Sequence, residues 1–214
     1  MKPYHKIQTV WSRDPDNKYK TLLDGVWSRP EFEYLKDCRW EFTEKVDGTN
    51  IRVGWDARRK VEFGGRTDNA QIPAQLYSRL TQLFGAQQTT ARIFADNDEV
   101  TLYGEGYGAK IQKGGGNYIP NGVSFVLFDV MVGDVWLSRK DVRDVADQLD
   151  IRVVPPVGSG TLADAVAFVR SQPMSTWGLF PAEGIVCKPA VELSDRMGRR
   201  IITKIKAKDF AEAA

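Results

Sequence analysis

The spacing of apolar residues along the 214-residue chain predicts short strands with a few helices between them. Within residues 44–55, the apolar Ile51, Val53 and Trp55 alternate with Asn50, Arg52 and Gly54, which is the period of a half-buried strand with the second set on its polar face. Residues 61–63 can pair back with this strand through the turn-rich segment 56–60, which predicts a β-hairpin. Further strands are expected at residues 99–103, 124–132, 152–157, 184–188 and 200–207.

Three segments have apolar residues at the 3.6-residue spacing of amphipathic helices. They are residues 72–84, 138–149 and 161–170. Gly85 supplies a stop for the first helix, and Ser138 precedes Asp141 by three residues, which is the spacing of a capping box. We expect the apolar stripe of each helix to lie in the core.

Residues 104–122 contain seven glycines, which favours a loop over regular structure. Lys110, Lys113 and Tyr118 interrupt the glycines, so the segment does not resemble a plain linker. One interpretation is a functional loop whose lysines reach a nucleic-acid backbone, with glycine permitting close approach. The alternative is a mobile hairpin without a role.

Composition restricts the function classes only loosely. With 42% hydrophobic residues the chain can bury a sizeable core, and a net charge of +2 does not by itself indicate a nucleic-acid protein. Cys38 and Cys187 form neither a disulfide framework nor a zinc-ligand set, which indicates a reducing, cytoplasmic setting. No apolar run of about 18 residues occurs, so no membrane span is expected. His5 is the single histidine, which disfavours histidine-based catalysis.

The most informative peptide is Glu-Lys-Val-Asp-Gly-Thr-Asn at residues 44–50, which places Lys45 just before a strand. A lysine amine is almost entirely protonated at pH 7, so a nucleophilic lysine needs nearby cations or desolvation. Lys204 and Lys206 share one face of a strand, roughly 7 Å apart, and such a self-repelling pair is stabilised by a polyanion such as a nucleoside triphosphate. Taken singly, each of these lysines is an ordinary solvated side chain.

Two carboxylates, one aromatic residue and one arginine extend this pattern. Glu105 is expected at the end of one strand and Glu183 at the start of another, where one can bind a ribose hydroxyl and the other a divalent cation. Phe128 can stack on a base, which is worth about 1–3 kcal/mol, although strand aromatics are mostly core residues. Arg66, within Gly-Gly-Arg-Thr, can contact a sugar or phosphate.

In chain order these peptides resemble the covalent nucleotidyltransferase superfamily of polynucleotide ligases and RNA capping enzymes. The matching segments are Lys45-Val46-Asp47-Gly48 as the nucleophile motif, Tyr103-Gly104-Glu105, Phe128, Glu183-Gly184-Ile185-Val186, and Lys204-Ile205-Lys206. Finer features are similar to phage-type, nick-sealing RNA ligases of RNA repair: the Gly-Thr-Asn start, Arg66, and the Glu-Gly-x-Val-x-Lys-Pro form around Lys188. Five ordered motifs are much more specific than the nucleophile motif alone.

The resemblance implies an α+β fold, namely an antiparallel-sheet nucleotidyltransferase domain of the ATP-grasp-like ligase adenylation type with flanking helices. This domain is expected over residues 45–214, with residues 1–44 as an N-terminal lead-in packed on it. The implied cofactors are ATP and Mg²⁺ or Mn²⁺. Lys45 would form lysyl-AMP, and AMP would pass to a 5′-phosphate end that a 3′-hydroxyl then attacks.

The resemblance also implies a set of binding residues. The nucleotide-binding set is Glu44, Asp47, Asn50, Arg66, Glu105, Phe128, Glu183, Lys204 and Lys206. Glu183 is the implied metal ligand, and Lys110, Lys113 and Lys188 are implied nucleic-acid contacts. Glu44 is expected to point away from Lys45 if the strand has already begun. The outer cations of the closing segment, including Arg199 and Arg200, are expected to follow the phosphate backbone.

Ligases of this superfamily usually carry a second domain, often a C-terminal OB fold, that clamps the nucleic acid. Only eight residues follow Lys206, so we expect no C-terminal OB domain and consider a partner protein as the source of a clamp. The expected substrates are RNA ends in nicked duplexes or single strands. The sequence leaves three alternatives open: a DNA ligase, a GTP-using capping-type enzyme, and a non-catalytic nucleic-acid-binding relative.

Overall fold

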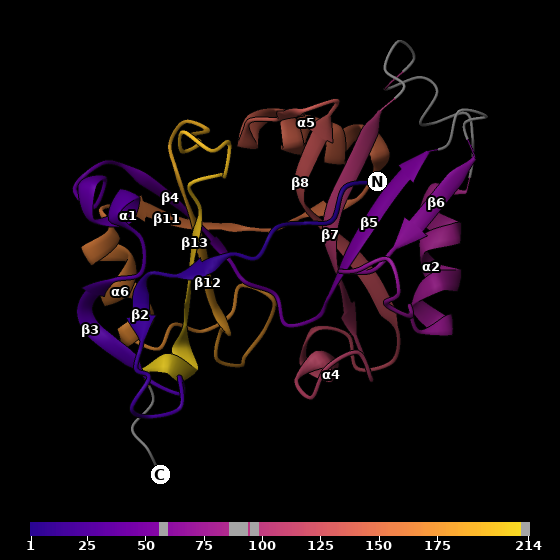
Figure 1. Cartoon of the computed structure of the whole chain (residues 1–214). Coiled ribbons are helices and arrows are strands. Elements are labelled where there is room, and N and C mark those ends of the chain that lie inside the picture. The colour runs from indigo at the N-terminus through magenta and orange to yellow at the C-terminus, as the bar shows by residue number, and fades with distance from the viewer. Residues whose placement is uncertain (56–59, 86–93, 95–98, 211–214) are drawn as a thin grey trace. The chain divides into compact units, whose positions relative to one another are not determined.

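The computed structural model describes residues 1–55, 60–85, 94 and 99–210 (Figure 1). The chain forms two compact units, each assembled from segments that are distant in sequence. Unit 1 comprises Met1–His5 with Asp47–Val154, and unit 2 comprises Lys6–Val46 with Pro155–Ala214. The division expected from the sequence, a lead-in before residue 45 and a catalytic domain after it, stays a prediction.

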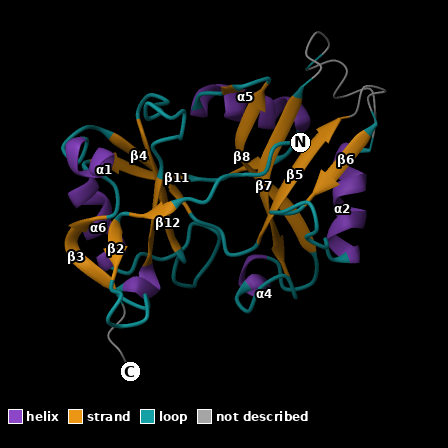
Figure 2. Ribbon diagram, in the orientation of Figure 1, coloured by secondary structure: helices purple, strands orange, loops and turns teal. Residues whose placement is uncertain are grey.

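Unit 1 is built on a sheet with the strand order β10-β8-β7-β5-β6, in which β9 also pairs with β8. Figure 2 shows β8, β7, β5 and β6 side by side in this order. The strands are β5 (Thr49–Trp55), β6 (Val61–Gly64), β7 (Val100–Gly108), β8 (Val123–Val132), β9 (Val135–Trp136) and β10 (Arg152–Val153). All pairs are antiparallel except β10 with β8. The expected hairpin is confirmed as β5 and β6, and its turn at residues 56–59 lies outside the described residues.

Two amphipathic helices supply part of the core of unit 1. The helices among the described residues of this unit are α2 (Ala74–Phe84), α4 (Gly115–Tyr118) and α5 (Arg139–Leu149). The apolar stripes of α2 and α5 are buried in one cluster with side chains of β5, β7 and β8, as their spacing predicted. Ser138 begins α5 by accepting a hydrogen bond from the Asp141 amide at 3.3 Å. The first two helix predictions are therefore confirmed.

The expected loop over residues 104–122 is wrong for much of its length. β7 continues to Gly108 and pairs with β8 throughout, and α4 follows a few residues later. A Cβ on Gly104 would overlap the ring of Phe125, and a Cβ on Gly106 would overlap Leu76. These glycines therefore permit close packing against β8 and α2, and they do not make the segment flexible.

Unit 2 contains a sheet with the order β1-β13-β12-β4-β11 and a separate ribbon of β2 and β3. The strands are β1 (Gln8–Thr9), β2 (Trp11–Arg13), β3 (Leu22–Trp27), β4 (Trp40–Glu44), β11 (Pro156–Gly160), β12 (Gly184–Pro189) and β13 (Thr203–Lys206). The helices are α1 (Pro30–Tyr34), α6 (Leu162–Arg170) and the 3₁₀ turn η1 (Ala207–Asp209). Thr161 and Asp164 form a reciprocal capping box at the start of α6, which confirms the third helix.

The segment 152–157, expected as one strand, is instead divided between the two units. β10 pairs with β8 in unit 1, whereas β11 pairs with β4 in unit 2. The break falls at Pro155 and Pro156, which lack the amide hydrogen that a continuous central strand requires. With mostly antiparallel sheets and few helices, the predicted α+β class is confirmed. Within the described residues, no helix is both long and apolar enough to span a membrane.

Candidate active site

Lys45 and Glu183 meet at one end of two neighbouring strands in unit 2. Lys45 follows the last residue of β4, Glu183 precedes the first residue of β12, and these strands are antiparallel partners. The Lys45 amide donates to the Gly184 carbonyl at 2.9 Å. The Lys45 ammonium lies 2.5 Å from one oxygen of Glu183, and the Lys206 ammonium lies 3.4 Å from the other. Glu183 thus bridges two lysines that are distant in sequence.

Strand β13 supplies Lys206, the second lysine of this cluster, and it also contains Lys204. Thr203 and Ile205 are buried, whereas Lys204 and Lys206 are half-buried, so the two lysines share one face as predicted. The side chains of Lys45, Glu183 and Lys206 are 22%, 19% and 20% exposed. They are therefore partly shielded from water and still accessible. Two ammonium groups on one carboxylate leave a net positive charge, which suits an incoming polyphosphate.

Glu44, the residue before Lys45, is held inside unit 2. It is 2% exposed. One of its oxygens accepts from the Ser175 hydroxyl at 2.5 Å, and the other accepts from the amide and hydroxyl of Thr176 at 2.8 and 2.6 Å. The sequence did not indicate Ser175 and Thr176, because a Ser-Thr pair in a loop has no distinctive pattern. These contacts anchor the end of β4 immediately before Lys45.

In unit 1, Asn50 on β5 lies directly opposite Glu105 on β7. Directly opposite residues place their side chains on the same face of a sheet. The side-chain oxygen of Asn50 is buried and accepts no hydrogen bond within the part of the chain that the structure describes. A buried acceptor beside a carboxylate is suited to a ligand that donates hydrogen bonds, such as a sugar hydroxyl.

The peptide that follows the candidate nucleophile is held by the segment around α4. The amide of Asp47 donates to the Tyr118 hydroxyl at 3.1 Å, and the side-chain amide of Gln112 donates to the Gly48 carbonyl at 3.2 Å. Neither contact could be predicted from the sequence, because hydrogen bonds to backbone groups leave no signature in it. Lys110 and Lys113 are exposed on this same segment.

Phe128 and Arg66 also lie in unit 1. Phe128 is half-buried on β8, and the ring of Tyr4 meets it edge-on at 5.0 Å between centroids. Arg66 is exposed after the end of β6. The residue before it is held by Arg52, which donates to the Gly65 carbonyl at 2.8 Å and is 2% exposed. The alternating pattern predicted an outward, polar Arg52, so its burial was missed.

Lys188 and Arg200 are buried together, away from the solvent. Each is 4% exposed. Arg200 donates to both oxygens of Glu192 at 3.1 and 2.7 Å, and the Lys188 ammonium lies 3.4 Å from the same carboxylate. The expectation that Arg200 follows a phosphate backbone at the surface is wrong, because its buried guanidinium donates to both oxygens of Glu192. Lys188 is buried as well, and its assignment as a nucleic-acid contact stays a prediction.

No cluster of three or more His, Cys, Asp or Glu side chains that could hold a metal occurs in the described ranges of the chain. Mg²⁺ usually keeps several waters and is bound by one or two carboxylates together with substrate phosphates. A single carboxylate such as Glu183 fits that kind of site, in which nucleotide phosphates supply the remaining ligands. It does not fit a metal held by protein ligands alone.

A lysine placed between two β-strands, beside a carboxylate and a second lysine, in an α+β fold is the arrangement expected of covalent nucleotidyltransferases. The chain belongs to the RNA ligase family, whose model matches residues 39–206. The resemblance seen in the motifs is thereby confirmed at the level of the family. No curated protein matches the chain in sequence.

Several solved structures share the fold. The chain is similar to Naegleria gruberi RNA ligase with PPi, with a TM-score of 0.64, 20% identity, and coverage of 94% of this chain and 56% of that one. It is also similar to a variant of that ligase with ATP and Mn, with a TM-score of 0.63, 20% identity and coverage of 83% and 52%. A further variant, with AMP and Mn, matches with a TM-score of 0.64, 19% identity and coverage of 94% and 56%. The chain therefore spans about half the length of these ligases.

Proposed function

We propose that the chain is the adenylation domain of an ATP-dependent RNA ligase that joins 3′-hydroxyl and 5′-phosphate ends. The observation that carries the proposal is the Lys45–Glu183–Lys206 cluster, in which one carboxylate holds two ammonium groups at 2.5 and 3.4 Å. Family membership supports RNA as the substrate. The similar ligase structures with ATP and Mn, and with AMP and Mn, support ATP and a divalent cation as cofactors.

In the first step the Lys45 amine attacks the α-phosphate of ATP. A phosphorus–nitrogen bond forms, the bond to the pyrophosphate oxygen breaks, and the product is lysyl-AMP. Glu183 orients the amine and lies close enough to accept its proton. Lys204 and Lys206 stabilise the negative charge that develops on the phosphates. A bound Mg²⁺ or Mn²⁺, held by Glu183 and the nucleotide, would supply charge neutralisation of the triphosphate.

Residues of unit 1 bind the nucleoside in this proposal. The buried oxygen of Asn50 and the carboxylate of Glu105 accept hydrogen bonds from ribose hydroxyls. Phe128 stacks on the adenine, and Arg66 contacts a phosphate or the sugar. Asp47 is fixed by its amide contact to Tyr118 and keeps the peptide after the nucleophile in place.

The second and third steps act on polynucleotide ends. AMP passes from Lys45 to a 5′-phosphate, and a 3′-hydroxyl then displaces AMP to form the phosphodiester. We assign Lys110 and Lys113, which are exposed beside the peptide after Lys45, as contacts to the nucleic-acid backbone. A partner protein that clamps the RNA, and a cytoplasmic location, are further parts of the proposal. Cys38 and Cys187 form no disulfide bond within the described residues, which agrees with a reducing compartment.

The test is transfer of label from ATP radiolabelled at the α-phosphate. With Mg²⁺, the purified chain should acquire label that survives denaturing electrophoresis and alkali and is lost in hot acid, as expected of a phosphoramidate. ATP labelled at the γ-phosphate should leave the protein unlabelled. Lys45→Ala should abolish labelling, whereas Lys140→Ala on the exposed face of α5 should label normally.

Three outcomes would contradict parts of this proposal. Absence of label from both ATP and GTP would exclude the enzyme and favour a nucleic-acid-binding relative. Label from GTP alone would favour a capping-type enzyme. If the chain acquires label from ATP, sealing of nicked DNA in preference to nicked or single-stranded RNA would identify a DNA ligase.

A further inference from the structure

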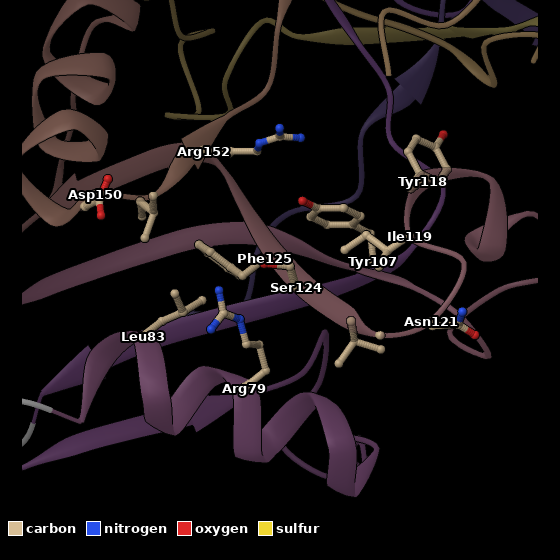
Figure 3. A pocket seen from close by; sticks show the side chains of 13 residues that line it. Arg79, Leu83, Tyr107, Tyr118, Ile119, Asn121, Ser124, Phe125, Asp150 and Arg152 are labelled. Carbon is tan, nitrogen blue, oxygen red and sulfur yellow. The ribbon is translucent and has the colours of Figure 1, made fainter. Parts of the chain in front are cut away.

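Unit 1 contains a pocket of about 520 Å³ that shares no lining residue with the proposed nucleotide-binding set (Figure 3). Its walls come from α2, α4, β7, β8 and the start of β10. The polar side chains include Arg79 from α2, Tyr107 from β7, Ser124 from β8 and Arg152 from β10. The pocket therefore gathers hydrogen-bond donors from segments that are distant in sequence.

The guanidinium groups of Arg79 and Arg152 both favour ionisation of the Tyr107 hydroxyl in this pocket. Arg152 hydrogen-bonds the Tyr107 hydroxyl, and the positive charges of Arg152 and Arg79 both favour its ionised form. Ser124 also hydrogen-bonds this hydroxyl. Asp150 supplies the one carboxylate among the lining residues, so the charged side chains of the pocket sum to +1. Paired arginines in a partly enclosed site favour bidentate binding of phosphate.

The hydroxyl of Tyr107 remains a donor at physiological pH. Burial raises the pKa of Tyr107 above its ordinary value, and the nearby arginines counter this only in part. A neutral phenol can donate to a phosphate oxygen, whereas a phenolate would repel it. The half-buried ring of Tyr118 packs edge-on against the buried ring of Tyr107 at 6.0 Å and 73°, so Tyr118 adds an aromatic wall beside the polar groups. A phosphate with an adjoining base matches both features of the lining.

We propose that this pocket binds one nucleotide of the RNA substrate, with its phosphate at Arg79 and Arg152 and its base against the half-buried ring of Tyr118. The identity of the ligand rests on the proposed ligase function. The wall of the pocket also contacts the peptide that follows the nucleophile, because the Tyr118 hydroxyl accepts from the Asp47 amide at 3.1 Å. Bound RNA therefore stabilises the conformation of residues that come just after Lys45 in the chain.

The proposal is tested by RNA binding to the whole chain without ATP. Fluorescence anisotropy with a labelled, 5′-phosphorylated single-stranded RNA would give the dissociation constant over a range of salt concentrations. Arg79→Gln and Arg152→Gln should each weaken binding about tenfold, since each removes a charge-assisted hydrogen bond. Each should also make the negative slope of log affinity against log salt less steep by about 0.7, the value for one phosphate contact on a single strand.

Two control variants separate a local contact from total charge. Arg143→Gln removes the same charge from the exposed face of α5 and should change neither the affinity nor the salt slope. Asp150→Asn removes the negative charge of the pocket and should strengthen RNA binding. Thermal melting of each variant checks that it is folded.

RNA affinities for Arg79→Gln and Arg152→Gln that equal the affinity of the Arg143→Gln control would overturn the proposal. Calorimetry with AMP and with inorganic phosphate gives a second comparison. If Arg79→Gln and Arg152→Gln lose binding of AMP or phosphate but bind RNA normally, the pocket is a free-nucleotide or phosphate site, and the RNA assignment is overturned. Sealing rates, normalised to the fraction of lysyl-AMP formed, should fall with RNA affinity. A chain that forms no lysyl-AMP would contradict the ligase function and not the pocket, because the binding measurement uses no ATP.

Discussion

The buried carboxylate of Glu44 gives a sharp prediction about what holds the candidate nucleophile in place. Ser175→Ala removes a hydroxyl that donates to Glu44 at 2.5 Å and that accepts from the Trp177 amide at 3.1 Å. Because Ser175 is 7% exposed and Glu44 2% exposed, water has little access to replace the lost donor. A hydrogen bond to a buried charge is worth about 1.5–3 kcal/mol, so we expect a loss of about 2–3 kcal/mol in the free energy of unfolding.

Thr176→Val is the matched comparison. The Thr176 hydroxyl donates to the same carboxylate at 2.6 Å, but the residue is exposed, so water can take its place. We expect a cost below about 1 kcal/mol for this variant. Urea unfolding followed by circular dichroism measures both costs. In thermal melts, Ser175→Ala should lower the Tm by about 5–10 °C, given about 2–4 °C per kcal/mol for a chain of this size.

Two further measurements connect this contact to Glu44 and to chemistry. In a double-mutant cycle, Ser175→Ala and Glu44→Gln should show a coupling of at least about 1 kcal/mol. Lysyl-AMP formation by Ser175→Ala should slow about tenfold, because the strand end before Lys45 is less firmly held. Equal costs for Ser175→Ala and Thr176→Val, or a cost below about 0.5 kcal/mol for Ser175→Ala, would refute the reasoning.

Three other predictions concern unit 1. Tyr4→Phe should lower the free energy of unfolding by about 1.5–3 kcal/mol in urea titrations, because it removes a 2.5 Å hydrogen bond to the buried Asp129; no loss would mean that another donor suffices. Gly104→Ala should cost about 1–3 kcal/mol in the same assay, since its Cβ would overlap the Phe125 ring, and a neutral result would contradict the close packing. The raised pKa of Tyr107 means that the folded state keeps this proton when the unfolded state releases it near pH 10, so stability falls as the pH rises above about 10. Tyr107→Phe should flatten that fall in unfolding titrations between about pH 9 and 11, and parallel pH profiles for both proteins would argue against it.

Local sequence patterns were sufficient to predict the helices α2, α5 and α6, because these patterns depend only on residues within each helix and its cap. The amphipathic spacing in α2, α5 and α6 places apolar side chains on one face whatever the rest of the chain does. Capping at Ser138 and Thr161 depends only on residues three positions further along. These features are encoded within a dozen residues, so the sequence was sufficient to find them.

The errors fall where a distant segment decides the outcome. The glycine-rich stretch was predicted to be a loop because glycine is usually flexible, but Gly104 lies under the Phe125 ring and belongs to a strand. Arg52 alternates with apolar residues and was assigned to the polar face, yet the Gly65 carbonyl and the Asp68 carboxylate satisfy it inside the unit. In both positions the partner comes from another strand or loop, which the local pattern does not contain.

The sequence by itself determined the chemistry that is available: a lysine in a nucleophile motif, two carboxylates, and a pair of lysines at spacing two, in the order typical of the family. Only the tertiary structure decided which of these groups meet. The adjacent order β13-β12-β4 brings Lys206 and Lys45 to the same carboxylate of Glu183, although Lys45 and Glu183 are 138 positions apart. Lys188, similar in type and on the same β12, is instead buried against Glu192. The charge of a side chain is a property of its residue, whereas its partner depends on the strand order and on the face of the sheet to which it points.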